Sequence, residues 1–180
     1  EGTASVAAVN GVATFSNLSL RGTVGTFTLT YTLRSTSVAN TQSIVLGHGV
    51  ASQLAMTSPA TLVNDTVFGT QPIVTIQDQD GNICTTSSAA VVASMTSGLS
   101  ATTSVNAVNG VATFSGLKFT GLIGSKSITY TLDQTAISVA DTFTVVAGTP
   151  HKVTLVTSAS GAVNGVNFTT QPTVEIQDIS

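Results

Sequence analysis

The residues with the strongest potential for chemistry lie in one short segment, Asp78-Gln79-Asp80-Gly81-Asn82. Oxygen-bearing side chains alternate there around a glycine, which is how short calcium loops begin. A complete loop also needs a bidentate carboxylate further along, and residues 83–117 contain no Asp or Glu. The segment therefore has two interpretations, a calcium turn with ligands from Asp78, Asp80 and Asn82, or a hydrogen-bonded β-turn around Gly81. Calcium is the one cofactor that the residues suggest.

Nucleophilic catalysis would need a histidine base close to an activated serine or cysteine. The chain has two histidines, His48 and His151, and they occupy different positions of the repeat described below. Cys84 is the only cysteine, so no disulfide can form within the chain. We expect it to be a small buried strand residue. These observations predict a protein without enzymatic activity.

Two other patterns allow more than one interpretation. Lys126 stands where the other copy of the repeat has Phe27, at an inward position of a predicted strand. Its stem can pack there while the ammonium group reaches the rim, or it can form an isopeptide crosslink. Asn17, Asn64 and Asn167 each begin a glycosylation sequon, and turns or solvated strand faces explain these asparagines equally well.

The composition excludes two classes of partner. Charged residues make up 7% of the 180-residue chain and hydrophobic residues 42%, with a net charge of −3. No cationic surface is available to neutralise phosphates, so nucleic acid is not an expected partner. In the uncharged stretch between Asp80 and Lys118 the longest apolar run is AAVVA at 89–93, which is too short to cross a bilayer.

The chain repeats itself. Residues 8–33 return as 107–132 with 16 of 26 positions identical at an offset of 99, and 68–78 return as 168–178 with eight of eleven identical at an offset of 100. Repetition at a fixed period is the signature of a tandem array, in which equal units build length or reach.

The phase of the repeat divides the chain into three parts. We expect 1–47 to be the closing half of a unit, 48–147 a complete unit, and 148–180 the opening half of another. The joints between them are so short that we expect a semi-rigid rod. The two half-units leave two alternatives open: the chain is a window of a longer array, or chains complement one another head to tail.

Each unit is expected to be a β-sandwich with essentially no helix. Inward residues alternate with threonines, as in Ile128, Tyr130 and Leu132, which is the period of a half-buried strand. The pairs Asn10-Gly11 and Asn109-Gly110 predict two-residue hairpin turns. Such a turn would pair Val105 with Phe114 and Ala107 with Ala112. Short strands with regular turn signals favour two packed antiparallel sheets.

The order of these segments resembles a known family. IVTIQDQDGNIC at 73–84, AVNGVATFSGL at 107–117 and SITYTL at 127–132 resemble the bacterial immunoglobulin-like repeats of large surface and adhesin proteins. The resemblance implies tandem immunoglobulin-like sandwiches and an extracellular or cell-surface location. It carries over no catalytic residues, because the matching positions are turn and core positions.

The sequence thus supports two functions. The first is a non-catalytic structural repeat, a stalk or fibre element whose partners are like chains or neighbouring repeats. Few charges protect its sheet edges, so contacts between chains are permitted. The alternative is an adhesive module that binds a glycan or a surface protein through loops near 79–87, 97–104 and 133–137.

Overall fold

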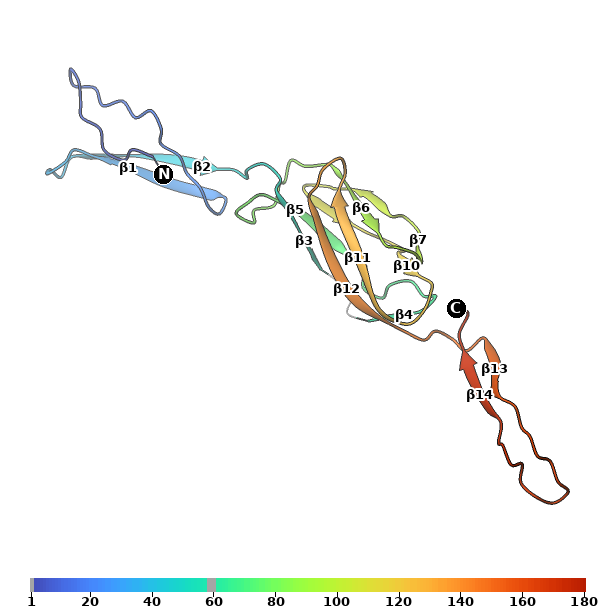
Figure 1. The fold of residues 1–180 in the computed structure, drawn as a ribbon. Coiled ribbons are helices and arrows are strands. Elements are labelled where there is room, and N and C mark those ends of the chain that lie inside the picture. Colours follow the sequence, from blue (N-terminus) through green and yellow to red (C-terminus); the bar gives the residue numbers. More distant parts are fainter. Residues whose placement is uncertain (1, 58–60) are drawn as a thin grey trace.

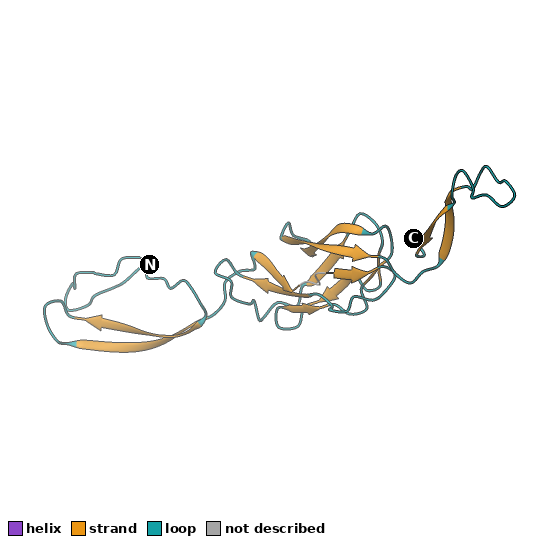
Figure 2. Cartoon of the chain, turned by 90° about the horizontal axis from the view of Figure 1, so that it is seen from below, coloured by secondary structure: helices purple, strands orange, loops and turns teal. Residues whose placement is uncertain are grey.

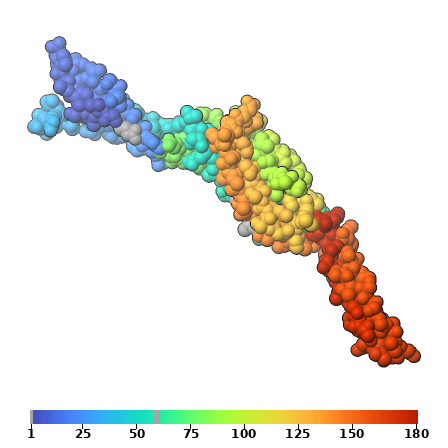
Figure 3. All heavy atoms as spheres, viewed as in Figure 1, coloured from blue at the N-terminus to red at the C-terminus, as the bar shows by residue number. Residues whose placement is uncertain are grey.

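The computed structural model describes residues 2–57 and 61–180 as an elongated chain (Figure 1). The middle is thick and rounded, and a thinner arm extends from each end of it (Figure 3). Strands and loops make up the described residues, and no helix occurs among them (Figure 2). The prediction of an all-β fold is confirmed. We call residues 2–46 the head, 53–147 the complete unit and 152–180 the tail, and the segments between them the linkers.

The complete unit is a sandwich of two main sheets. Five strands in the order β4-β12-β11-β6-β8 form one sheet, in which only the β4–β12 pair is parallel. Three antiparallel strands in the order β3-β5-β9 form the other, and β10 pairs with β7 in a short ribbon. The strands are β3 Gln53–Thr57, β4 Thr61–Val63, β5 Ile73–Gln77, β6 Ala90–Ser94, β7 Leu99–Ser100, β8 Ser104–Asn106, β9 Val111–Thr113, β10 Lys118–Phe119, β11 Gly124–Leu132 and β12 Ser138–Val146.

The core lies between these sheets and follows the alternation in the sequence. Ile128, Tyr130 and Leu132 of β11 are buried, while the threonines between them are partly exposed. Tyr130 meets Phe114 edge to face, with 5.4 Å between the ring centroids. Aromatic pairs of this geometry add to the stabilisation from burial alone. All eighteen buried apolar residues of the described chain belong to the complete unit.

The structure places both Asn-Gly pairs in tight turns. Asn109 and Gly110 have φ values of 51° and 77°, and Asn10 and Gly11 have 50° and 79°. Positive φ at both central positions defines a type I′ turn, which asparagine and glycine adopt more easily than other residues. Backbone bonds of 2.8 and 3.0 Å between Val108 and Val111 close the turn in the complete unit.

The predicted pairing beyond this turn is wrong. β8 pairs with β6 and β9 pairs with β5, so Val105 lies opposite Val91 instead of Phe114, and Ala112 lies opposite Val74. The turn therefore joins the two sheets instead of continuing as a hairpin. The alternating pattern is the same in either case, because the inward residues of both segments face one core from opposite sides.

The head repeats one piece of the complete unit. Its strands β1, Gly25–Thr32, and β2, Ala39–Leu46, pair in the register of β11 and β12. Gly25 lies opposite Leu46 just as Gly124 lies opposite Val145. Residues 2–22 run beside this ribbon mainly as loop (Figure 2).

The tail repeats a different piece, β3 and β5. Its strands β13, Lys152–Thr157, and β14, Thr173–Gln177, are antiparallel, and their register shifts between Leu155 and Thr157. The bulge places one extra residue, Val156, in β13. It accounts for the change of the repeat offset from 99 to 100, so the insertion is absorbed inside a strand.

Candidate functional site: the joints between units

The segment singled out in the sequence lies at the joint between the head and the complete unit. β5 ends at Gln77, and the chain turns through Gly81, whose φ is 83°. The carboxylate of Asp78 organises this turn, because its Oδ1 accepts the backbone N–H groups of Asp80 and Asn82, both at 2.9 Å. This is the local bonding that lets aspartate begin a turn.

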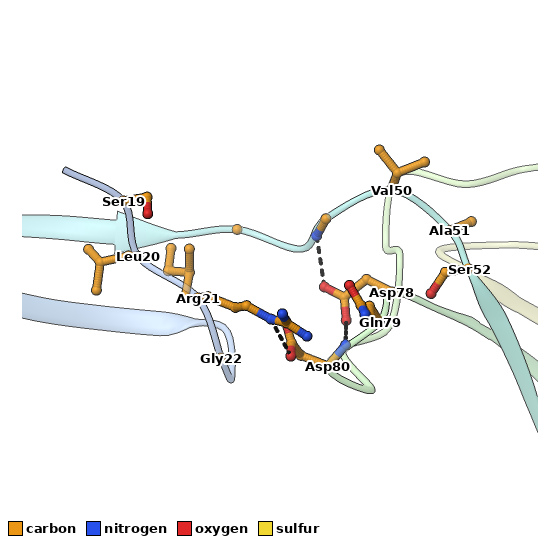
Figure 4. A pocket seen from close by; sticks show the side chains of 13 residues that line it. Ser19, Leu20, Arg21, Gly22, Val50, Ala51, Ser52, Asp78, Gln79 and Asp80 are labelled. Carbon is orange, nitrogen blue, oxygen red and sulfur yellow. Dashed lines mark hydrogen bonds and ion pairs between the residues drawn. The ribbon is translucent and has the colours of Figure 1, made fainter. Parts of the chain in front are cut away.

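The same carboxylate also binds the linker. Its Oδ2 accepts the N–H of Gly49 at 2.8 Å (Figure 4). The Nδ2 of Asn82 donates to both oxygens at 3.1 and 3.0 Å. Asp78 is only 4% exposed. The N–H of Gly49, followed by the amide of Asn82, holds the pKa of Asp78 well below its ordinary value of 3.8, because each donor favours the charged form.

Asn82 extends this contact into the head. Its Oδ1 accepts the N–H of Val24 and its Nδ2 donates to the carbonyl of Gly22, both at 2.9 Å. The Nε of Arg21 lies 3.0 Å from Oδ1 of Asp80 at the rim of the same contact (Figure 4). Head, linker and complete unit therefore meet around one buried amide and one buried carboxylate.

The second joint uses the same chemistry. Oδ2 of Asp178 in the tail accepts the N–H of Gly148 at 2.9 Å and the Nδ2 of Asn64 at 2.8 Å. Oδ1 of Asn64 accepts the N–H of Gly121 at 2.9 Å, and Asn64 is 1% exposed. The N–H of Gly148, then the amide of Asn64, lower the pKa of Asp178.

We call this arrangement the joint latch: a carboxylate after the opening strands of one unit, a glycine in the linker before it, and a buried amide that ties the carboxylate to a loop of the preceding unit. The members are Asp78, Gly49 and Asn82 in the first joint, and Asp178, Gly148 and Asn64 in the second. The carboxylates and the glycines are repeat counterparts, whereas the two amides come from opposite sides of the joint.

Sterics distinguish the two linker glycines. A Cβ on Gly148 would lie 2.5 Å from the carbonyl oxygen of Asn64, which is closer than any real contact. A Cβ on Gly49 would lie 3.5 Å from the side chain of Asp78, an ordinary van der Waals distance. The second joint therefore requires a glycine, whereas the first uses only its backbone N–H.

Charged groups surround the second latch. Lys118 Nζ lies 2.6 Å from Oδ1 of Asp65, and Thr120 donates to the same oxygen at 3.1 Å. Lys118 is the main cause of the lowered pKa of Asp65. Thr120 is the repeat counterpart of Arg21. The Arg21–Asp80 pair joins the head to the complete unit, whereas the Lys118–Asp65 pair lies within the complete unit.

The three predicted calcium ligands do lie together. Five hydrogen bonds from N–H donors point at the oxygens of Asp78, and Asp80 pairs with Arg21. Within the described ranges, no three His, Cys, Asp or Glu side chains form a metal-ligand group. Calcium binding stays a prediction, and the hydrogen bonds favour the other interpretation, a β-turn around Gly81.

The histidines lie at separate joints. Nδ1 of His48 is 2.8 Å from the carbonyl oxygen of Gly49, and its Nε2 is 3.1 Å from Oγ1 of Thr86. His151 is exposed, and its backbone N–H donates to Gln177. The Sγ of Cys84 lies 3.7 Å from the same carbonyl oxygen of Gly49 that the His48 ring contacts.

Cys84 is buried as expected, but in the loop after β5 instead of a strand. Burial, and then the charge of Asp78, raise the pKa of its thiol.

Lys126 packs as predicted at the rim, with Nζ 5.9 Å from the centroid of the Phe119 ring. Of the sequon asparagines, Asn64 is buried in the second latch.

Sequence reasoning missed Gly49, Gly148 and Asn64. The glycines recur at the repeat offset, which is a signal that could have identified them. Asn64 gave no such signal, because its role depends on a residue 114 positions later.

No family model matches the chain, and no curated protein matches it. No described helix has the length and apolar character needed to span a bilayer.

Proposed function

We propose that this chain is a non-catalytic structural repeat of an extracellular microbial surface protein, where it serves as a stalk or fibre element. The joint latch carries the proposal, because the same carboxylate-to-glycine contact occurs at both joints. A binding or catalytic protein needs one well-formed site, whereas a stalk needs the same connection to be repeated along its length.

The linkers support this role because their backbone N–H groups donate hydrogen bonds to the unit that follows. β2 ends at Leu46 and β3 begins at Gln53, and in between Gly49 and Ser52 donate their N–H groups to Asp78 and Gln77. The second linker repeats these bonds with Gly148 and His151. A linker held in this way restricts the angle between neighbours, unlike a Gly/Ser tether of equal length.

The strand arrangement of the complete unit supports the immunoglobulin-like part of the proposal. Two sheets of five and three strands share one core, and the turn at Asn109-Gly110 crosses from one sheet to the other. Immunoglobulin-type sandwiches distribute consecutive strands between two sheets in this way. Fold alone does not decide function, so the joints carry the functional argument.

The adhesive alternative has less support. Residues 79–82 of its first loop are engaged in the first joint through Asp80 and Asn82. A ligand would therefore have to use residues 83–87 or the loops 97–104 and 133–137, and none of these segments contains an aromatic residue. Aromatic side chains are the usual platform for sugars.

Small-angle X-ray scattering of the chain, measured below the concentration at which chains associate, tests the stalk role. The expected distance distribution is that of one extended shape with the length of the structure. Replacing both Asp78 and Asp178 by Ala should broaden it, whereas Asp133→Ala, at an exposed aspartate that belongs to neither latch, should leave it unchanged. A wild-type profile typical of independently tumbling parts would contradict the proposal.

A further inference from the structure

The head and the tail each expose an apolar sheet face that is covered in the complete unit. Ile176 of β14 is 71% exposed, and its counterpart Ile76 is 0% exposed. In the head, Leu33 is 62% exposed, and its counterpart Leu132 is 4% exposed. Such faces on opposite ends of one chain need an explanation, because monomeric proteins rarely expose large apolar patches.

The complete unit shows what covers these faces. Of its eighteen buried apolar residues, three lie in 81–99, which has no counterpart in the head or the tail. All the other fifteen have apolar counterparts. Those in the tail are Val153, Ala162, Phe168, Val174 and Ile176, and those in the head are Ala8, Ala13, Phe15, Leu18, Leu20, Leu29, Tyr31, Leu33, Ile44 and Leu46.

The two faces are therefore the two sides of one core. In the complete unit β5 pairs with β9, so that Val74 lies opposite Ala112. The same register would place Val174 of a tail opposite Ala13 of a head. The tail would bring β13 and β14, the head would bring the third strand of that sheet, and β1 and β2 would form the facing sheet.

We propose that the tail of one copy of this chain docks on the head of a second copy and rebuilds a sandwich between the two chains. The inference rests on the proposed structural role and adds a partner to it. Head and tail lie at opposite ends of the elongated chain, so a copy does not close on itself (Figure 1). The contact is head to tail, and repeated contacts of this kind build open chains or rings.

Residues 2–46 and 152–180 contain no counterpart of β6, Ala90–Ser94. β6 lies between β11 and β8 and buries Val91 and Ala93 in the core. Its absence would leave the edge of β1 near Tyr31 unpaired and a gap in the core. The contact between chains is therefore expected to be weaker than the packing inside the complete unit, and to depend on protein concentration.

Sedimentation of the full chain tests the inference. Wild-type chain should exceed twice its monomer mass of 18.1 kDa as its concentration rises. Leu46→Asp damages only the head and Ile176→Asp only the tail, so each variant alone should remain monomeric. Their equimolar mixture should form a dimer and go no further, because one intact tail and one intact head remain. Ser43→Asp, on the outward face of β2, is the matched control and should associate like wild type.

A disulfide test fixes the register. With Cys84 replaced by Ala, Ala13→Cys and Val174→Cys chains should form a mixed disulfide on oxidation, whereas Thr28→Cys and Val174→Cys chains should not. An unchanged melting transition of the complete unit in every variant shows that folding is intact. Wild-type chain that stays monomeric at every concentration would overturn the inference. That outcome would not contradict the stalk role, provided that scattering still shows one extended shape.

Discussion

The complete unit and the head contain the same strand pair in the same register, and they differ in what covers it. Tyr130 is 0% exposed in the complete unit, whereas Tyr31 at the equivalent position is 37% exposed. Both rings contact a phenylalanine, at centroid distances of 5.4 and 5.9 Å. The pairing of strands is therefore encoded locally, whereas burial of the core requires the second sheet.

The largest expected effect comes from removing one of these phenylalanines. Phe114→Ala should lower the unfolding free energy of the complete unit by about 3–5 kcal/mol, because it opens a cavity in a closed core. Phe15→Ala removes the equivalent ring from the head, where no closed core exists, and should leave this transition unchanged. Denaturant unfolding measures both. Equal losses of unfolding free energy in the two variants would contradict this prediction, because they would show that the head and the complete unit do not unfold independently.

The second comparison is between Asn64, which binds across the second joint, and its counterpart in an exposed turn of the tail. Asn64→Ala removes the buried amide that binds Asp178 and Gly121, and should cost about 1–3 kcal/mol because the N–H of Gly121 loses its partner. Asn164, the exposed counterpart in the tail, is the control, and its replacement by Ala should change stability by about 0.5 kcal/mol or less. Thermal unfolding would contradict the joint assignment if both variants behaved alike.

Acid should loosen the joints before it unfolds the complete unit. The folded-state pKa values of Asp78 and Asp178 lie below the ordinary value of 3.8, so their contribution is present above that pH and is lost as the pH falls through the folded values. The charged groups facing them are the Arg21–Asp80 pair at the first joint, where the uncharged thiol of Cys84 also lies, and Lys152 and Asp65 at the second.

Scattering across this acid range, compared with far-UV circular dichroism of the same samples, measures the effect. A broadened shape with unchanged strand content is expected. Asp78→Asn should already show part of this change at neutral pH at the first joint. A shape that stays constant until the strands are lost would contradict the prediction.

The smallest effect should come from the ion pair at the first joint. Arg21 and Asp80 have side chains 50% and 28% exposed, so Arg21→Ala should cost about 0.2–1 kcal/mol, and less at high salt. Arg34→Ala, in the loop after β1, is the matched surface control. Denaturation in low and high salt would contradict the assignment if the loss for Arg21→Ala exceeded that for Asn64→Ala.

The sequence predicted what depends on local pattern. Alternating residues in 124–132 and the Asn109-Gly110 turn lead directly to β11 and to the type I′ geometry. The partners of the strands around that turn could not be predicted, because the pattern is the same whether two inward faces share a sheet or oppose each other. Only part of the joint latch could be predicted. The turn role of Asp78 follows from the local sequence, but Gly49 and Asn64 act through residues far along the chain.

The distance between equivalent strands of the head and the complete unit tests the central claim, that latched joints fix the angle between units. Spin labels at Ser43 of β2 and Thr142 of β12, with the buried Cys84 replaced by Ala, report it by dipolar spectroscopy. The account predicts one narrow distance distribution at neutral pH that broadens in Asp78→Ala and stays narrow in Asp133→Ala. A broad distribution in the parent chain, unaffected by Asp78→Ala, would contradict it.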